Sequence, residues 1–351
     1  MDPFLWSVVK ISTITALAFI GAGLLTPLVT HYLYKYKLGK SIRVAEQAPV
    51  YHQHHAHKAG TPTMGGVIIW LTVALLAGLV FVLNKIPGLE ALANLDFLSR
   101  SQTWLPLGAL LAAAVVGLVD DFFNVRKIGP VGGGLRLWHK LLLYAVIAAI
   151  GAWWFFFKLD WDVLSVPFYG DVNVGWWYIP IFFLVIVATS FSVNETDGLD
   201  GLAGGVLMTN FIAFGAIAYM QGKYDLAALC GAIVGALLAF LWFNVPPARF
   251  FMGDTGAMAL GVTLGIIAML TNTVVLLPII GIILVIESLS VIIQVLSRRF
   301  RGKKVFHSAP WHHHLEAVGW PEAKIVMRLW IISGVFSLVG FIIYLISIYG
   351  S

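Results

Sequence analysis

Carboxylates and amides of this chain gather in short polar segments that interrupt long apolar runs. Asp120 and Asp121 are adjacent, Asp254 stands among glycines in FFMGDTG, and residues 194–201 read N-E-T-D-G-L-D-G. Carboxylate oxygens bind Mg²⁺ and accept protons from incoming acids. Because carboxylates are costly in so apolar a chain and are rarely kept there without a use, these residues predict an enzyme.

Asp120 and Asp121 follow the apolar run LLAAAVVGLV, so we expect them at the C-terminal end of a helix. The helix macrodipole disfavours anions there, and two adjacent carboxylates also repel each other. A solvated helix end is the alternative, but Mg²⁺ or a proton from an incoming acid would offset both costs. Asn124, one helical turn beyond Asp120, would complete a polar site.

Asp254 precedes another apolar run, where an aspartate often acts as the N-cap of a helix. The neighbouring Gly253 and Gly256 would also let a ligand approach the backbone closely. Both roles stay open. We expect a metal role because the other rare carboxylates are predicted on the same face.

The spacing of Asn194, Asp197 and Asp200 does not suit an EF-hand loop, which needs ligands at positions 1, 3 and 5 and a later glutamate. A tight glycine-rich turn is one interpretation of this segment. Two aspartates and two glycines near membrane depth also suit hydrogen bonding to a polar ligand, which we expect here. Glu195 is expected to face solvent.

Three histidines, His312 to His314, follow Pro310-Trp311. Three consecutive side chains cannot all point the same way on a helix, so this run does not predict a trihistidine zinc site. One or two of the histidines are expected to donate hydrogen bonds to phosphate or diphosphate. An upstream polar loop holds further histidines that we expect mainly to be solvated: His52, His54, His55 and His57.

The segment GTPTMGG, residues 60–66, opens an apolar run. Free N–H groups at a helix N-terminus attract phosphate. The segment is not a Walker loop, because the order G-x-x-x-x-G-K-[ST] is absent. Lys58 would add positive charge beside it, and Lys140 would do the same unless it snorkels to the interface.

Glu287 and Gln294 are seven residues apart in one apolar run and therefore share a helical face. A charged residue within a span usually faces the interior of the bundle. Gln294 is expected to read a polar group, and Glu287 is expected to hold another side chain in place.

The elements that position these residues are predicted to be membrane-spanning helices. The chain has 351 residues, of which 60% are hydrophobic and 11% are charged, so it is too apolar for a soluble domain. We predict an all-α integral membrane protein, a single polytopic domain over 1–351. Its ten spans lie near 7–30, 65–83, 104–119, 137–157, 177–193, 202–220, 226–243, 257–271, 275–297 and 326–349.

The distribution of basic residues predicts the orientation. If both termini lie outside, only five of the 22 lysines and arginines are outside, namely Lys10, Lys85, Arg100, Lys158 and Lys223. The other 17 then lie inside, as the positive-inside rule requires. This orientation places an active-site cleft at the cytoplasmic face, in the loops 31–64, 120–136, 194–201, 244–256 and 298–325.

Other features are expected to be structural or to exclude functions. Residues 158–176 alternate polar and β-favouring residues and predict a short hairpin outside the membrane. Cys230 stands alone in an apolar run and is expected to be inert packing. The net charge of +5 is mostly juxtamembrane, which favours anionic lipids or an anionic substrate over nucleic acid.

Together these motifs resemble the phospho-N-acetylmuramoyl-pentapeptide transferases, a family of polyprenyl-phosphate N-acetylhexosamine-1-phosphate transferases. GTPTMGG, VDDFFNVRK, TDGLDGLA, FMGDTG and APWHHHLE occur in the family's order and cover nearly the whole chain. Each motif alone is weak, but five in order are specific. The histidine run favours this branch over the N-acetylglucosamine branch, which remains an alternative.

The resemblance implies a Mg²⁺-dependent enzyme of a bacterial cytoplasmic membrane that acts in peptidoglycan synthesis, usually as a homodimer. Its reaction would be transfer of phospho-MurNAc-pentapeptide from UDP-MurNAc-pentapeptide to undecaprenyl phosphate, giving lipid I and UMP. By matching motifs, Asp120, Asp121 and Asp254 would be catalytic and metal-binding, and His313 would be catalytic. The implied substrate-binding residues are Lys58, Thr63, Asn124, Lys140, Asn194, Asp197, Leu199, Asp200, Asn244, Phe251, Gln294, His312 and His314.

Within that set the resemblance assigns uracil stacking to Phe251 and a uracil hydrogen bond to Gln294. Asn124 and Glu195 depart from residues common in the family. A one-step attack by the lipid phosphate and a two-step route through an aspartyl phosphate are both open. Two other classes remain as alternatives: a secondary transporter, which also uses intramembrane acids, and a scaffold for lipid-linked assembly.

Overall fold

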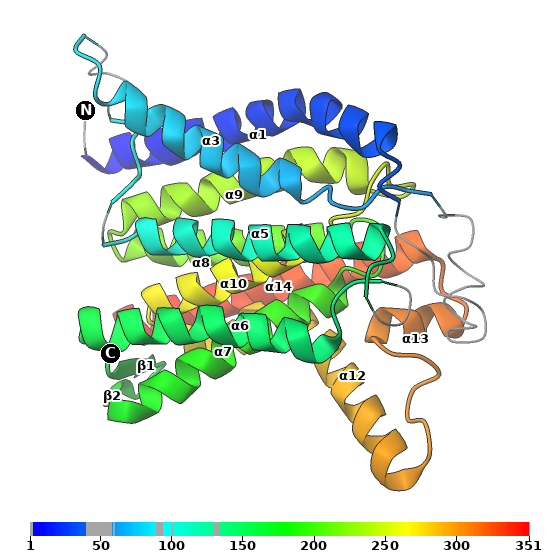
Figure 1. Cartoon of the computed structure of the whole chain (residues 1–351). Helices are drawn as coiled ribbons and strands as arrows, with labels where there is room; N and C mark the ends of the chain where they lie inside the picture. The colour runs from blue at the N-terminus through cyan, green and yellow to red at the C-terminus, as the bar shows by residue number, and fades with distance from the viewer. Residues whose placement is uncertain are drawn as a thin grey trace.

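The structure is a computed structural model of the chain, and it describes residues 3–39, 58, 60–88, 94–99, 101–129 and 133–350. Long helices run side by side through the molecule, and a two-stranded sheet is the only regular sheet in the described part (Figure 1). The long helices are α1 (Pro3–Lys35), α3 (Val67–Leu83), α5 (Trp104–Val125), α6 (Leu137–Trp153), α7 (Tyr178–Thr196), α8 (Leu202–Met220), α9 (Tyr224–Asn244), α10 (Gly253–Leu270), α12 (Ile282–Arg301) and α14 (Glu322–Tyr349).

Short elements connect these helices. They are the π-helical turn η2 (Trp154–Lys158), the strands β1 (Val163–Val166) and β2 (Gly170–Asn173), the 3₁₀ turns η3 (Gly175–Trp177) and η4 (Val274–Leu276), and the helices α11 (Leu277–Ile280) and α13 (Trp311–Ala317).

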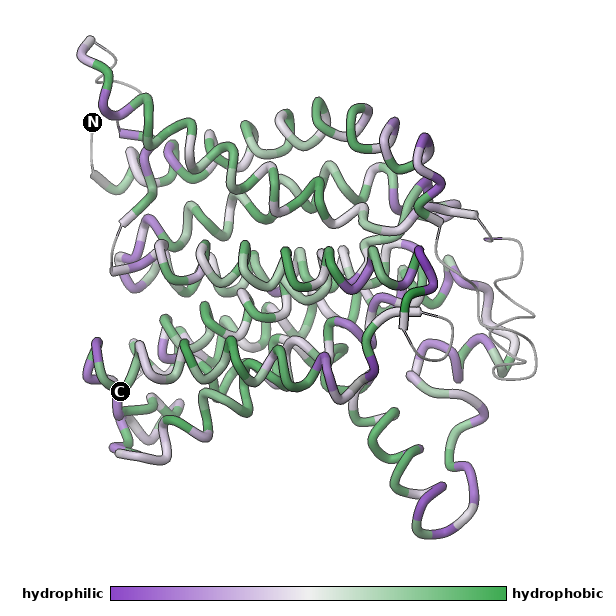
Figure 2. The backbone as a smooth tube through the Cα atoms, viewed as in Figure 1, coloured by the Kyte–Doolittle hydropathy of each residue, from purple (hydrophilic) through white to green (hydrophobic). Residues whose placement is uncertain are grey.

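The helices confirm an all-α integral membrane protein. Among the described residues, eight helices are long and apolar enough to cross a membrane, and one bent pair supplies a ninth span. Helix α3 is apolar but has only 17 residues, at the lower limit for crossing a hydrocarbon core. Each of the ten predicted spans falls on a helix or on the bent pair. If α3 also crosses the membrane, the number of spans is ten rather than nine. The middle part of each long helix is mostly hydrophobic, and the hydrophilic residues lie mainly near the helix ends and in the loops (Figure 2).

Two differences between the predicted spans and the observed helices bear on the site and on the course of the chain. Helix α5 continues to Val125, six residues beyond the predicted end, so Asp120 and Asp121 lie within its last two turns rather than at its end. The span predicted over 275–297 is not one straight helix. It is bent by 82° between α11 and α12, next to Gly281, and α12 then continues to Arg301.

Helix α10 is the centre of the bundle, since 94% of its apolar window is buried. It packs against α5 on one side and α7 on another. Gly117 allows the close approach of α5, because a Cβ there would collide with the backbone of Asp254 and Thr255. The packing therefore brings the ends of α5, α7 and α10, with their carboxylates and amides, to one place.

The predicted hairpin is confirmed. Strands β1 and β2 pair antiparallel with Val163 opposite Asn173 and Val166 opposite Gly170. The side chain of Asn272 accepts the N–H of Ser165 at 3.1 Å, which fixes the hairpin to the turn after α10. The hairpin lies at the end of the bundle opposite α13, and both chain ends lie on the hairpin side (Figure 1).

Candidate active site

Lys140, in the first turn of α6, joins two of the predicted carboxylates. Its Nζ lies 2.7 Å from Oδ2 of Asp120 and also donates to Oδ2 of Asp254. The side chain of Asp120 is 1% exposed and that of Lys140 is 17% exposed. The lysine therefore points into the bundle rather than snorkelling to the interface. Two carboxylates share one ammonium, so the group keeps a net negative charge.

Neutral donors complete this group. The N–H of Leu135 donates to Oδ1 of Asp120 at 2.5 Å, and Nδ2 of Asn194 donates to Oδ1 of Asp254 at 2.6 Å. Charge-assisted hydrogen bonds of this kind are about twice as strong as neutral ones. The predicted cluster thus draws its members from α5, α6, α7 and α10, and the residues fix one another's positions.

Asp121 faces a different set of donors from its neighbour Asp120. Its carboxylate accepts the N–H of Thr255 at 3.0 Å and the hydroxyl of Thr63 at 3.4 Å. It therefore caps the N-terminus of α10, where exposed N–H groups favour an anion. Asp254 is not the N-cap considered from the sequence, because it lies inside the first turn of α10.

The three aspartates lie around the same turn of α10, but they do not form a preformed three-carboxylate cage. In the described part of the chain, no group of three histidine, cysteine, aspartate or glutamate side chains could hold a metal ion. Mg²⁺ usually binds through one or two carboxylates and completes its shell with water and substrate phosphates. The donor set around Asp254 fits a metal shared with a phosphorylated substrate.

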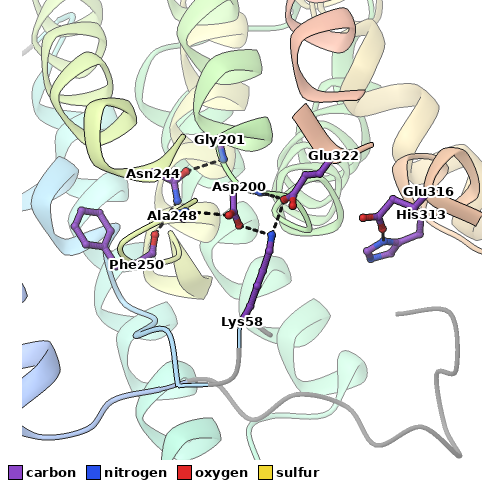
Figure 3. A network of polar contacts seen from close by, with 9 residues as sticks. All are labelled: Lys58, Asp200, Gly201, Asn244, Ala248, Phe250, His313, Glu316 and Glu322. Atoms are coloured by element: carbon purple, nitrogen blue, oxygen red, sulfur yellow. Dashed lines mark hydrogen bonds and ion pairs between the residues drawn. The ribbon is translucent and has the colours of Figure 1, made fainter. Parts of the chain in front are cut away.

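A second polar network surrounds Lys58 (Figure 3). Nζ of Lys58 lies 2.7 Å from Oδ1 of Asp200 and 2.6 Å from Oε1 of Glu322. Oδ2 of Asp200 accepts the N–H of Ala248 at 3.0 Å. The network joins the segment before α3, the turn before α8 and the first turn of α14.

Side-chain hydrogen bonds tie the turn before α8 to the segment between α9 and α10. Asn244 accepts the N–H of Gly201 at 3.0 Å and donates to the carbonyl of Phe250 at 2.8 Å. Asp197 accepts the N–H of Gly253 at 3.1 Å. Two predicted binding segments, 194–201 and 244–256, thus form one unit beside Asp254. Phe251 is half-buried in this unit, and Leu199 is buried.

The three histidines of α13 do not share one polar partner, as expected for consecutive helical residues, although the rings of His312 and His313 are in contact with centroids 4.2 Å apart. His312 is fully buried, and its Nδ1 lies 2.9 Å from Oε2 of Glu287. Burial alone would lower the pKa of His312, but the Glu287 carboxylate overcomes this and raises it. The contact also confirms that Glu287 holds another side chain.

The other two histidines have separate partners. Nδ1 of His313 lies 2.7 Å from Oε2 of Glu316. His314 stacks on His307 with ring centroids 5.3 Å apart, and its Nδ1 accepts the N–H of His307 at 3.2 Å. Burial and the charge of His307 lower the pKa of His314. Of the three, only His312 is fully enclosed by protein.

The predicted substrate-binding residues Gln294 and Asn124 differ in whether the protein itself satisfies their polar atoms. Oε1 of Gln294 accepts the N–H groups of Val305 and Phe306, both at 3.0 Å, and its Nε2 donates to the carbonyl of Phe306 at 2.9 Å. Gln294 therefore fixes the segment between α12 and α13. Asn124 lies beside Asp120, as a continued α5 requires, and its buried Oδ1 has no hydrogen-bond partner among the described residues. His52, His54, His55 and His57 lie outside the described residues.

Two glutamates of the site were not predicted. Glu322 follows Pro321 at the start of α14, where an acidic residue suits any helix N-terminus, so its position carries no distinct signal. Glu316 stands three residues after His313 on α13, and that spacing alone is enough to indicate a side-chain pair.

Residues 58–69 match the phospho-N-acetylmuramoyl-pentapeptide-transferase signature 1, and residues 103–272 match Glycosyl transferase family 4. Similarity to individual proteins extends over nearly the whole chain. The phospho-N-acetylmuramoyl-pentapeptide-transferase of Chloroflexus aggregans is 37% identical over 96% of this chain and 90% of its own. Those of Geobacillus kaustophilus and Rubrobacter xylanophilus are 40% and 39% identical, over 93% and 96% of this chain and 95% and 97% of their own.

The chain belongs to the phospho-N-acetylmuramoyl-pentapeptide-transferase family. This assignment confirms the resemblance drawn from the five motifs. The family signature begins at Lys58 and includes Thr63. The matched 103–272 region contains the Asp120, Lys140 and Asp254 group. The Lys140 group therefore lies within the matched regions, whereas Glu322 and the histidines of α13 lie outside them.

Proposed function

We propose that this chain transfers phospho-MurNAc-pentapeptide from UDP-MurNAc-pentapeptide to undecaprenyl phosphate, forming lipid I and releasing UMP in peptidoglycan synthesis. The main support for this proposal is the cluster of Lys140, Asp120 and Asp254. In this cluster one ammonium holds the two carboxylates together at the end of an apolar bundle. A reaction between a lipid-linked phosphate and a nucleotide sugar needs such a group at a membrane surface. Family membership supports the choice of substrates.

Asp120 is the residue that acts on the lipid phosphate in this proposal. It lies near the end of a membrane-crossing helix, where a phosphate on an apolar chain would arrive. The carboxylate orients that phosphate or takes its proton, and the phosphate then attacks the β-phosphorus of the donor with UMP as the leaving group. Lys140, bonded to Asp120, offsets negative charge as the two anions approach.

Asp254 and Asn194 hold the diphosphate end of the donor. Asp254 is the residue best placed to bind Mg²⁺ together with diphosphate oxygens, and Mg²⁺ bound there would neutralise charge on the transferring phosphoryl group. The nucleotide is proposed to bind against the side chains of Lys58, Asp200 and Asn244. Phe251 is proposed to stack near uracil. His313, with Glu316 behind it, is proposed to donate a hydrogen bond to the diphosphate.

The 17-to-5 distribution of basic residues supports a cytoplasmic active site and outside termini, in the inner membrane of a bacterium. The hairpin and both chain ends share the end of the bundle opposite α13, as this orientation requires (Figure 1). A homodimer remains part of the proposal on the family resemblance alone.

The test is UMP release by the purified chain in detergent with undecaprenyl phosphate and Mg²⁺. UDP-MurNAc-pentapeptide is compared with UDP-GlcNAc at equal concentration. We expect UMP from the first donor and at least about a hundredfold less from the second, since a poorly matched donor loses several transition-state contacts. Release from UDP-GlcNAc alone would assign the chain to the sister activity. No release from either donor, with solute flux in liposomes, would support a transporter.

A further inference from the structure

We infer that Glu322 is a positioning residue that holds Lys58 and the backbone of Asp200 in the arrangement that binds the nucleotide-sugar donor. The inference rests on the proposed function and extends the donor site to the first turn of α14. It assigns a role to the last helix, which contributes none of the residues predicted from the sequence.

A single carboxylate oxygen makes both contacts. Oε1 of Glu322 lies 2.6 Å from Nζ of Lys58 and accepts the N–H of Asp200 at 2.9 Å. Figure 3 shows Glu322 reaching across to these two groups from its own helix. An oxygen shared between a side-chain ammonium and a backbone amide fixes the two donors relative to each other.

The charged side chains of Lys58, Asp200 and Glu322 are largely buried, so loss of one partner would be costly. The side chain of Lys58 is 10% exposed, that of Asp200 is 3% exposed and that of Glu322 is 19% exposed. Buried charges of this kind are costly to leave unpaired. Among the described residues, Lys58 would keep only Asp200 as a charged partner without Glu322, and the N–H of Asp200 would lose its acceptor.

A second contact from α14 reaches the same turn. Nε1 of Trp330 donates to the carbonyl of Gly201 at 3.1 Å. Gly205 leaves the space that the Trp330 ring fills, because a Cβ there would collide with it. Glu322 and Trp330 therefore hold residues 200 and 201 from one helix. From this turn the network continues through Asp200 to Ala248 and through Asn244 to Phe250.

Glu322 acts on the donor through Lys58 and Asp200 and does not itself touch the reacting phosphorus. A residue of this kind changes binding of the donor more than the chemical step. The expected signature is therefore a raised KM for the donor with kcat nearly unchanged.

The experiment measures UMP release by the full chain in detergent, with donor titrated at saturating undecaprenyl phosphate. Glu322→Gln keeps the shape and one acceptor but removes the charge. We expect its KM for the donor to rise about tenfold and its kcat to stay within about twofold of the wild type. The matched control is Asp225→Asn, which breaks the 2.8 Å pair of Lys10 and Asp225 at the opposite end of the bundle. It should leave KM unchanged.

A double-mutant cycle identifies the partner. Lys58→Met alone should raise KM, and adding Glu322→Gln to it should raise KM by no more than about twofold further, because residues that act through one contact are not additive. Effects that multiply in full would overturn the inference. So would an unchanged KM in Glu322→Gln.

A second readout separates this inference from the proposed function. Acylation of Lys58 by an amine-reactive reagent, followed by mass spectrometry, reports how firmly its ammonium is held without any substrate. We expect Glu322→Gln to accelerate acylation of Lys58 by at least about threefold and Asp225→Asn to leave it unchanged. A wild type that releases no UMP contradicts the proposed function, whereas equal acylation rates contradict the role of Glu322.

Discussion

The carboxylate of Asp121 accepts the N–H of Thr255 at 3.0 Å, so a residue of α5 caps the N-terminus of α10. Its neighbour Asp120 instead faces Lys140 at 2.7 Å. Two adjacent aspartates thus have different surroundings: one holds two helices together and the other lies in the charged group with Asp254.

This difference predicts different effects of the two aspartates on the Mg²⁺ requirement. Asp254→Asn should raise the Mg²⁺ concentration for half-maximal UMP release, because it weakens the carboxylate best placed to hold the ion. Asp121→Asn should leave that concentration within about twofold and should lower the free energy of unfolding by about 0.3–1 kcal/mol, because the amide still accepts a hydrogen bond but loses the charge that favours the N-terminus of α10. Mg²⁺ titration and thermal unfolding in detergent measure both effects. A raised Mg²⁺ requirement in Asp121→Asn would show that Asp121 also holds the ion, as the motif resemblance implies.

Replacement of Lys140 should remove most of the activity. Lys140→Met leaves Asp120 and Asp254 without their shared ammonium, and we expect kcat to fall by about 10²–10³, as when one charge-stabilising donor is lost from an active site. Steady-state UMP release measures this. Lys223→Met is the control, since Lys223 donates to the carbonyl of Leu270 at the hairpin end, far from Asp120 and Asp254. Near-normal turnover in Lys140→Met would contradict its placement in the reaction.

The pair of His312 and Glu287 predicts a pH dependence of stability. Burial lowers the pKa of His312, but Glu287 reverses this and raises it above the unfolded value of 6.5. Protonated His312 therefore stabilises the folded chain. That contribution is complete below about pH 6.5 and is lost as the pH rises through the folded pKa.

The measurement compares melting temperatures of the wild type and Glu287→Gln in detergent, from below pH 6.5 upward through the folded pKa of His312. The wild type should exceed the variant most at low pH, and the difference should shrink as the pH rises. A difference that is constant with pH would show that the pair is not charged in the folded protein.

Gly198 predicts a steric effect on the same histidine. A Cβ at residue 198 would collide with Nε2 and Cε1 of His312, whose ring is fully buried. Gly198→Ala should cost about 1–3 kcal/mol of stability and displace His312 from Glu287. Gly78→Ala is the matched control, because nothing lies within 4 Å of its added Cβ. Equal melting temperatures for the two variants would disprove the expected contact.

Sequence patterns predicted the elements whose signals are local. Apolar runs of near-membrane length located every span, and alternation between 158 and 176 located the hairpin of β1 and β2. The geometry of consecutive residues on a helix predicted that His312, His313 and His314 would not all point the same way, and each has a different polar partner. The composition near Asp120 suggested a helix end, whereas packing against α10 carries α5 on to Val125.

Contacts between distant segments were harder to predict. Lys140 was predicted to add charge, but its bond to Asp254, 114 residues away, depends on how α6 packs beside α5 and α7. Glu322 was missed because its sequence position already has a local explanation at a helix start. The bend beside Gly281 was missed because 275–297 is long and apolar enough for a single span, and neither Pro278 nor Gly281 was read as a break in the helix.

The most direct test of the whole account is formation of the lipid product by the wild type and by Asp120→Asn. Both proteins are incubated in detergent with UDP-MurNAc-pentapeptide, undecaprenyl phosphate and Mg²⁺, and the extracted lipid is identified by mass spectrometry. We predict lipid I from the wild type and at least about a hundredfold less from Asp120→Asn, since its amide cannot take the proton or pair with Lys140 as a charge. Equal yields from the two proteins, or no lipid I from the wild type, would contradict the account.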